Sequence, residues 1–111
     1  MNFNIVVLGG RIITNVEYTV KPTGMRICTF LLASSRRWGV DREAIRTAYV
    51  FVKAFDGVGE LLAQRFDKGD YILVEGYLSS HRKMVDEKNV NLIDVVCERF
   101  QLPPPEYRKG S

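Results

Sequence analysis

The chain has 111 residues, which is enough for one domain with a single modest hydrophobic core. Hydrophobic residues make up 46% and charged residues 26% of it, so wholesale disorder is excluded. The net charge of +3 is only a mild basic bias. Basic residues nevertheless gather in two polar segments, which favours a polyanionic partner over two merely solvated loops. They are Arg36, Arg37, Arg42 and Arg46 in the first segment, and Arg82, Lys83 and Lys88 in the second.

Apolar runs are short throughout the chain. None has the length needed to cross a bilayer, and the run at residues 5–8 is too short for a signal peptide and lacks a basic leader. Cys28 and Cys97 lie in apolar runs without metal-ligand spacing, so buried free thiols are favoured over a disulfide. We therefore expect a cytoplasmic protein without a membrane partner.

The first two predicted strands span residues 3–18 and 25–35, with a turn at residues 21–24. Gly9 and Gly10 interrupt the first strand, and paired glycines within a strand indicate a bulge or a sharp bend of the kind that small barrels need. The second strand places apolar side chains on one face, namely Cys28, Phe30 and Leu32.

A polar, basic loop or flexible hairpin is predicted at residues 34–46, and it carries the chain's single tryptophan, Trp38. A strand follows at residues 47–56. Because successive side chains of a strand alternate between faces, one face is an ordinary core face of Val50, Val52 and Ala54. The other face bears Tyr49, Phe51, Lys53 and Phe55.

This aromatic face admits two interpretations. A buried ammonium at Lys53 would need a partner, so the face suits a surface on which bases stack while a cation meets phosphates. The alternative is an aromatic cross-strand ladder with a snorkelling lysine. The strand alone leaves both open.

One helix is predicted directly after this strand. Asp56 can cap it, and Gly69 is placed to end it. One apolar stripe runs along it, at Val58, Leu61, Leu62 and Phe66.

Two further strands are predicted at residues 71–79 and 90–102, joined by a charged hairpin tip at residues 81–89. The first of them is expected to bury Ile72, Val74 and Leu78. A proline run then ends the ordered region, which gives one domain over residues 1–102 and a short polar tail over residues 103–111. Five strands with one helix between the third and the fourth predict an all-β, five-stranded Greek-key barrel, the OB-fold.

Several segments together resemble the bacterial single-stranded DNA-binding protein family in order and spacing. They are Gly10-Arg11-Ile12, Pro22-Thr23-Gly24, residues 30–33, Trp38, Phe55, residues 60–63 and residues 68–78. The most specific piece is the Lys-Gly-Asp…Val-Glu-Gly-x-Leu block within residues 68–78, and the resemblance covers residues 3–102. It implies an OB-fold that binds and protects single-stranded DNA with little sequence preference in replication, recombination or repair, at the nucleoid, as a homotetramer or sometimes a homodimer.

The resemblance also implies site residues. Trp38 and Phe55 match stacking aromatics of the family, and Tyr49 occupies a stacking position that often holds Trp. A further stacking aromatic is missing, because Lys83 or Met84 stands about where the family has it. We predict that bases stack on Trp38, Tyr49, Phe51 and Phe55. The predicted phosphate contacts are Arg11, Arg36, Arg37, Lys53, Arg82 and Lys83, and His81 is expected at the surface.

Typical members carry a long tail with an acidic tip that recruits replication and repair enzymes, whereas residues 106–111 are basic. Either the sequence is a piece of a longer protein or it is a short accessory, phage or mobile-element member. Replication or repair partners are therefore not expected through an acidic tail. A self-associating apolar surface is predicted on the outer side of two strands, at Ile5, Val7, Ile13, Tyr71, Leu73 and Tyr77.

Three other functions stay open at this point. One is an OB-fold replication-restart (primosomal) adaptor whose main role is binding a protein partner, and another is RNA chaperoning by a cold-shock-like barrel. An enzyme is the weakest alternative, because the sequence shows no nucleophile–base pairing, no glycine-rich phosphate loop and no helix-borne metal motif. We expect neither a cofactor nor a metal ion.

Overall fold

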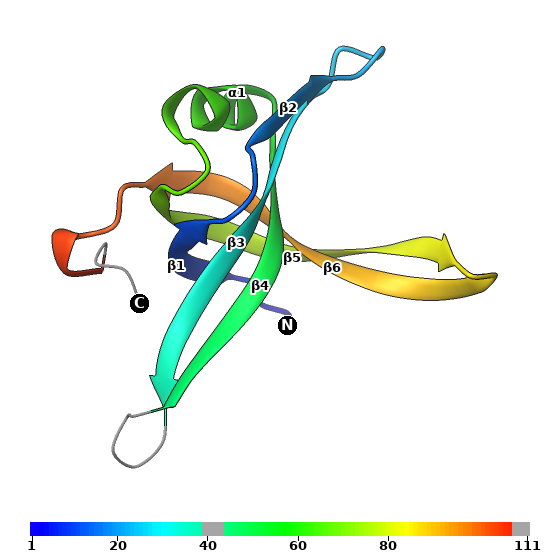
Figure 1. Cartoon of the computed structure of the whole chain (residues 1–111). Helices are drawn as coiled ribbons and strands as arrows, with labels where there is room; N and C mark the ends of the chain where they lie inside the picture. Colours follow the sequence, from blue (N-terminus) through cyan, green and yellow to red (C-terminus); the bar gives the residue numbers. More distant parts are fainter. Residues whose placement is uncertain (39–43, 108–111) are drawn as a thin grey trace.

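The computed structural model describes residues 1–38 and 44–107, and these form strands with one α-helix near the middle of the chain (Figure 1). The strands are β1 (Val6–Ile12), β2 (Glu17–Val20), β3 (Arg26–Trp38), β4 (Ala44–Phe55), β5 (Tyr71–Val85) and β6 (Lys88–Gln101). The helix α1 (Asp56–Arg65) joins β4 to β5, and a 3₁₀ turn η1 (Pro105–Tyr107) follows β6. No helix in the described ranges is long and apolar enough to span a membrane.

Five strands close into a barrel. The sheet order is β1-β5-β6-β4-β3-β2, and an additional pairing of β1 with β3 closes the ring. The predicted OB-fold barrel, with its helix after the aromatic strand, is thereby confirmed. β2 is the strand outside this ring, and among the described residues it pairs with β3 alone. The single strand predicted at residues 3–18 is in fact two, β1 and β2, separated by a short turn.

Inward-facing residues of the barrel strands form the core, together with one side of α1. The predicted core faces of β3 and β4 are confirmed, although Val50 is only half-buried. The fully buried or nearly buried members are Ile12, Cys28, Phe30, Leu32, Val52, Ala54, Leu62, Phe66, Ile72, Val74, Val95 and Cys97. Cys28 and Cys97 are free thiols, and burial raises the pKa of each to about 11.

β1 crosses β3 at Gly10. A Cβ atom there would lie 2.3 Å from the carbonyl oxygen of Ala33, so only glycine allows the two backbones to approach this closely. Of the bulge or sharp bend predicted at Gly9 and Gly10, the bulge is not observed, because β1 pairs with β5 through both residues without a register shift. The bulge lies instead between Glu75 and Gly76 of β5.

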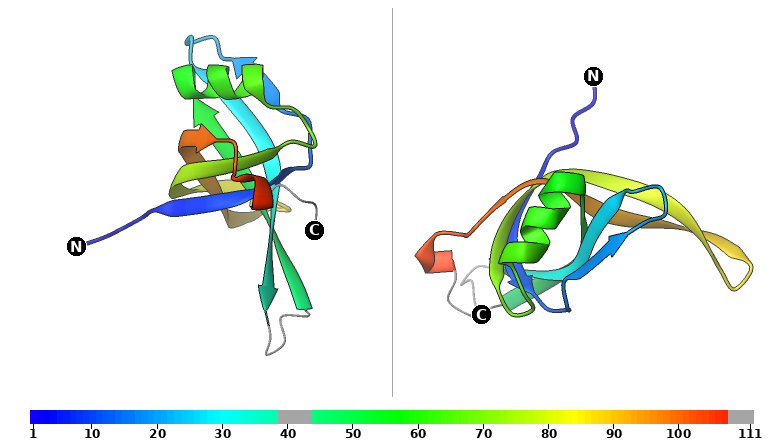
Figure 2. Two further views of the ribbon diagram at one scale, coloured as in Figure 1. Left: turned by 90° about the vertical axis from the view of Figure 1, so that its left-hand side faces the viewer. Right: turned by 90° about the horizontal axis from the view of Figure 1, so that it is seen from above.

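α1 lies across one end of the barrel (Figure 2). Its predicted limits need correction. Asp56 is the first helical residue and not its cap, and its Oδ1 accepts a hydrogen bond from the backbone N–H of Arg26. The helix ends at Arg65, so Gly69, with φ of +99°, belongs to the turn before β5. Leu61 is exposed, because the buried side of the helix is formed by Gly59 and Leu62.

Two hairpins extend beyond the barrel in different directions (Figure 1). We call residues 35–38 and 44–49 the β3–β4 arm, and residues 80–93 the β5–β6 arm. The described parts of the predicted loop at residues 34–46 are paired strand, and the charged tip predicted at residues 81–89 is reduced to a turn at Asp86 and Glu87. Leu78 was expected in the core but is 46% exposed, because it lies where β5 leaves the barrel.

Candidate nucleic-acid interface

The outer face of β4 exposes aromatic rings. Tyr49 is 65% and Phe51 is 56% exposed, whereas Val52 and Ala54 on the opposite face are fully buried. Phe55 is half-buried where β4 meets α1. The alternation predicted for this strand is therefore observed, and its rings are not sealed inside the barrel. Flat, accessible rings of this kind offer stacking surfaces to nucleobases.

β3 lies beside this face and keeps it open. Paired residues of antiparallel strands point to the same side, and the partners of Tyr49, Phe51 and Lys53 are Ala33, Leu31 and Thr29. Beside these partners, the rings of Tyr49 and Phe51 remain more than half exposed. Further along the β3–β4 arm, the hydroxyls of Ser35 and Thr47 lie 2.8 Å apart and form a hydrogen bond.

Lys53 is held by a carboxylate. Its Nζ lies 2.8 Å from Oδ2 of Asp94, whose side chain is only 7% exposed, while the Lys53 side chain is 33% exposed. Nδ1 of His81 lies 3.2 Å from the same oxygen. The Lys53 ammonium is thus partly accessible on the aromatic face, and the buried carboxylate of Asp94 balances its charge. Sequence reasoning missed Asp94, although a lone carboxylate within the apolar run at residues 92–97 was a signal for it.

The β5–β6 arm brings a second set of cations. Lys83 pairs with Val90 and is two residues from His81, so alternation places it on the side of Asp94 and Lys53. Arg82 pairs with Asn91 and points to the other side of the arm. Both side chains are exposed, but only Lys83 shares the aromatic face.

Arg11 lies on the far side of β3 from the aromatic strand. Its Nε donates a hydrogen bond to the carbonyl oxygen of Gly69 at 3.2 Å, and its guanidinium lies 5.9 Å from the ring centre of Tyr71. A groove of about 820 Å³ is lined by both Arg11 and Tyr49, so Arg11 adjoins the aromatic face through this groove.

The remaining predicted residues lie on the β3–β4 arm. Arg37 pairs with Ile45 and shares the side of Tyr49, whereas Arg36 pairs with Arg46 and points to the opposite side. The backbone of Trp38 pairs with that of Ala44, but the Trp38 side chain falls outside the described part of the structure, as does Arg42.

The structure thus brings one group of predicted residues together and separates others from it. Tyr49, Phe51, Lys53, Phe55, Lys83 and Arg37 share one face, and Arg11 adjoins it. Arg36 and Arg82 lie on the reverse sides of the two arms. Among residues 1–38 and 44–107, no group of three His, Cys, Asp or Glu side chains is placed to hold a metal ion.

Known proteins resemble this chain over most of its length. A single-stranded DNA-binding protein of Aquifex aeolicus is 32% identical over 101 residues, which cover 89% of this chain and 69% of that protein. Single-stranded DNA-binding protein 1 of Staphylococcus aureus is 33% identical over 108 residues, covering 93% and 62%. A Helicobacter pylori relative of the same description is 34% identical over 79 residues, covering 69% and 44%. The chain therefore spans less than two thirds of the length of two of these three relatives.

The fold also has a solved counterpart. The crystal structure of a small single-stranded DNA-binding protein from Streptomyces coelicolor superposes with a TM-score of 0.75, covering 93% of this chain and 96% of that one at 21% identity. The model of the Single-strand binding protein family matches residues 3–103, which include every strand of the barrel. With the barrel, the aromatic face and this match in agreement, the chain belongs to the single-strand binding protein family.

Proposed function

We propose that this chain binds single-stranded DNA along the outer face of β4, with little sequence preference. The observation that carries the proposal is the exposure of Tyr49 and Phe51 beside the ammonium of Lys53. Bases stack on the rings, together with Phe55 and Trp38, and each ring contributes about 1–3 kcal/mol. Since every base has a π face, this mode of binding tolerates sequence.

Phosphates are neutralised by cations on both arms. Lys83 and Arg37 share the aromatic face and are the first candidates, with Lys53 between them and Arg11 beyond the groove. Arg36 and Arg82 lie on reverse sides and meet the backbone only where the DNA passes around an arm. Family membership supports the same function, because the relatives are named for single-stranded DNA binding. In this proposal the protein acts by binding and not by catalysis.

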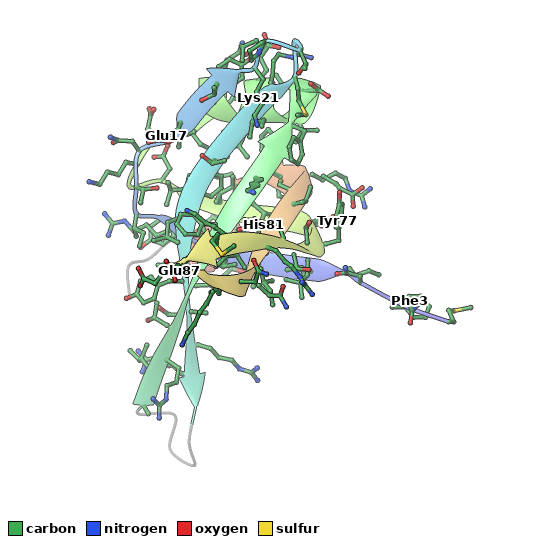
Figure 3. All side chains as sticks on the ribbon, turned by 90° about the vertical axis from the view of Figure 1, so that its right-hand side faces the viewer. Phe3, Glu17, Lys21, Tyr77, His81 and Glu87 are labelled. Atoms are coloured by element: carbon green, nitrogen blue, oxygen red, sulfur yellow. The ribbon has the colours of Figure 1, made fainter. Side chains whose placement is uncertain are left out.

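The proposal also includes a homo-oligomer, as a homotetramer or a homodimer. Residues Ile5 and Val7 expose 74% and 58% of their surface, and Phe3 extends from the barrel on the N-terminal segment (Figure 3). Within the described ranges, β1 pairs with β3 only at Arg11 and Ile12, and the Gly9 carbonyl accepts a hydrogen bond from Ser34 of β3, so the edge is open on that side from Val6 to Leu8. An open, apolar strand edge is a surface that a second copy can cover. Light scattering tests this part of the proposal, because it measures the mass of the assembly in solution.

Titration with oligo-dT, followed by tryptophan fluorescence, tests the DNA proposal. If roughly four phosphates are neutralised per subunit, the logarithm of the affinity falls with the logarithm of salt concentration at a slope near −3. An affinity that does not respond to salt contradicts the proposal. Oligo-rU serves as the comparison, because equal affinity for it would favour a general RNA-binding role.

A further inference from the structure

A lysine and a histidine share one carboxylate oxygen beneath the aromatic face. Asp94 is the one buried charged side chain among the described residues. Its Oδ2 lies 2.8 Å from Lys53 Nζ and 3.2 Å from His81 Nδ1. The three residues come from β6, β4 and β5, which are neighbours in the barrel. Lys53 and His81 therefore contact the same oxygen atom at the place where the two arms separate.

The charge of this cluster depends on a single proton. With a neutral imidazole, Asp94 and Lys53 cancel, and the cluster carries no net charge. With a protonated imidazole the cluster carries one positive charge, and the imidazolium competes with Lys53 for Asp94. Near His81, the other charged group on this side of the β5–β6 arm is Lys83. Ser79 and Leu92, which also neighbour His81 on this side, are uncharged. The His81 side chain is 44% exposed, so it can exchange a proton with solvent and lie close to a bound phosphate.

We propose that Asp94 and His81 control how strongly Lys53 attracts a phosphate, so that binding of single-stranded DNA to this face takes up a proton at His81. This inference rests on the proposed function. A phosphate beside Lys53 favours the protonated imidazole, and the protonated imidazole favours the phosphate, because linkage is reciprocal. The affinity for DNA therefore rises as pH falls through the range in which imidazoles titrate, between about pH 5 and 8.

The chain suits a clean test, because His81 is its single histidine. Oligo-dT is the probe, since thymine does not titrate in this range. At constant salt, the wild-type protein is expected to bind oligo-dT about three- to tenfold more tightly near pH 5.5 than near pH 8, as one further charge near a phosphate predicts. Calorimetry near pH 6.5 in two buffers of different ionisation enthalpy should record proton uptake on binding.

Two substitutions at the half-exposed position separate charge from structure. His81→Gln is expected to bind at both pH values as the wild type does near pH 8, without proton uptake. His81→Lys is expected to bind tightly at both. A matched control combines His81→Gln with Asn91→His, which moves the imidazole to the reverse side of the same arm, away from Asp94. This variant should lose most of the pH dependence.

Asp94→Asn should raise the affinity near pH 8, because Lys53 then has no carboxylate to balance its charge. Since Asp94 is buried, circular dichroism checks whether the Asp94→Asn variant folds. If this variant does not fold, the His81 variants alone test the proposal. The proposal is overturned if His81→Gln keeps the wild-type pH dependence, or if His81→Lys binds no more tightly than the wild type near pH 8. Absence of oligo-dT binding by the wild type at both pH values would instead overturn the proposed function.

Discussion

The barrel and the two arms are made from the same strands, yet they bury their side chains differently. Within the barrel, alternate residues of β4 and β5 are fully buried, as Val52 and Val74 are. In the arms, residues 44–49 of β4 and 80–85 of β5 are exposed on both sides. A two-stranded ribbon has no second layer to cover either of its faces. The comparison teaches that barrel residues determine stability and that residues of the arms, and of the face between them, are free to determine affinity.

The largest expected effect is on affinity. Tyr49→Ala and Phe51→Ala should each weaken oligo-dT binding about 5- to 150-fold, because each removes the stacking surface for a base. Both rings are exposed, so the free energy of unfolding should change by no more than about 0.5 kcal/mol. Fluorescence titration and urea denaturation measure the two quantities.

Tyr18→Ala is the matched control, since Tyr18 is an exposed ring on β2, outside the proposed face. Its affinity should equal that of the wild type. If Tyr49→Ala or Phe51→Ala unfolds the domain, or if Tyr18→Ala weakens binding as much, the distinction between barrel and arms is wrong.

The converse effect is expected in the barrel. At Gly59 of α1 a Cβ atom would lie 2.5 Å from the carbonyl oxygen of Ala54, so Gly59→Ala should lower the free energy of unfolding by about 1–3 kcal/mol. Gly57→Ala in the same helix meets nothing within 4 Å and should be neutral or stabilising by about 0.5–1 kcal/mol. Urea denaturation compares the two variants, and an equal effect of both substitutions would show that close packing does not govern the Gly59 position.

The stability of the barrel should also depend on pH in the alkaline range. Burial raises the pKa of Cys28 and Cys97 from 9.0 to about 11, so the folded state keeps both protons where the unfolded chain loses them. This stabilisation is complete below pH 9 and is lost as pH rises from about 9 to about 11, by up to about 1.4 kcal/mol per pH unit for each thiol. The double variant Cys28→Ala with Cys97→Ala should show a flatter dependence over that range in denaturation experiments. An unchanged slope would mean that the thiols do not contribute.

The smallest effect tests the two sides of the β5–β6 arm. Lys83→Gln should reduce the salt slope of oligo-dT binding by about 0.7, because one phosphate contact is lost. Arg82→Gln should change it less, since Arg82 points to the reverse side. The same charge is removed in both variants, so equal slopes would show that DNA passes around the whole arm.

Much of this arrangement could be predicted from local sequence. The alternation of β4 follows from residue types in one strand, and so the buried and exposed faces of Val52 and Phe51 were predicted correctly. Long-range geometry could not be predicted in the same way. The partner of Lys53 lies 41 residues away on β6, and nothing local to either residue joins Lys53 to Asp94.

Register decides the other differences. Arg82 and Lys83 are equivalent as neighbours in a basic segment, and only the pairing of β5 with β6 separates them. Leu78 has the spacing of a core residue, but β5 has already left the barrel at that position. Asp56 is of a residue type that is common at helix caps. The position of a cap depends on backbone angles, however, and the sequence does not reveal that these place the cap at Phe55.

Between β4 and β6 the ladder consists of two pairs, Val52 with Val95 and Lys53 with Val96. A longer pairing of β4 with β6 would join the two arms in one flat sheet and place Phe51 beside β6. Because this ladder stops after two pairs, the two arms diverge. The β4 side bears the rings of Tyr49 and Phe51, and the β5 side bears His81 and Lys83. Single-stranded DNA has bases on one side and phosphates on the other. Its bases would meet the rings, and its phosphates would meet the lysine and the histidine. Because this parallel ladder is short, the rings on β4 and the side chains of the β5–β6 arm stay apart and exposed.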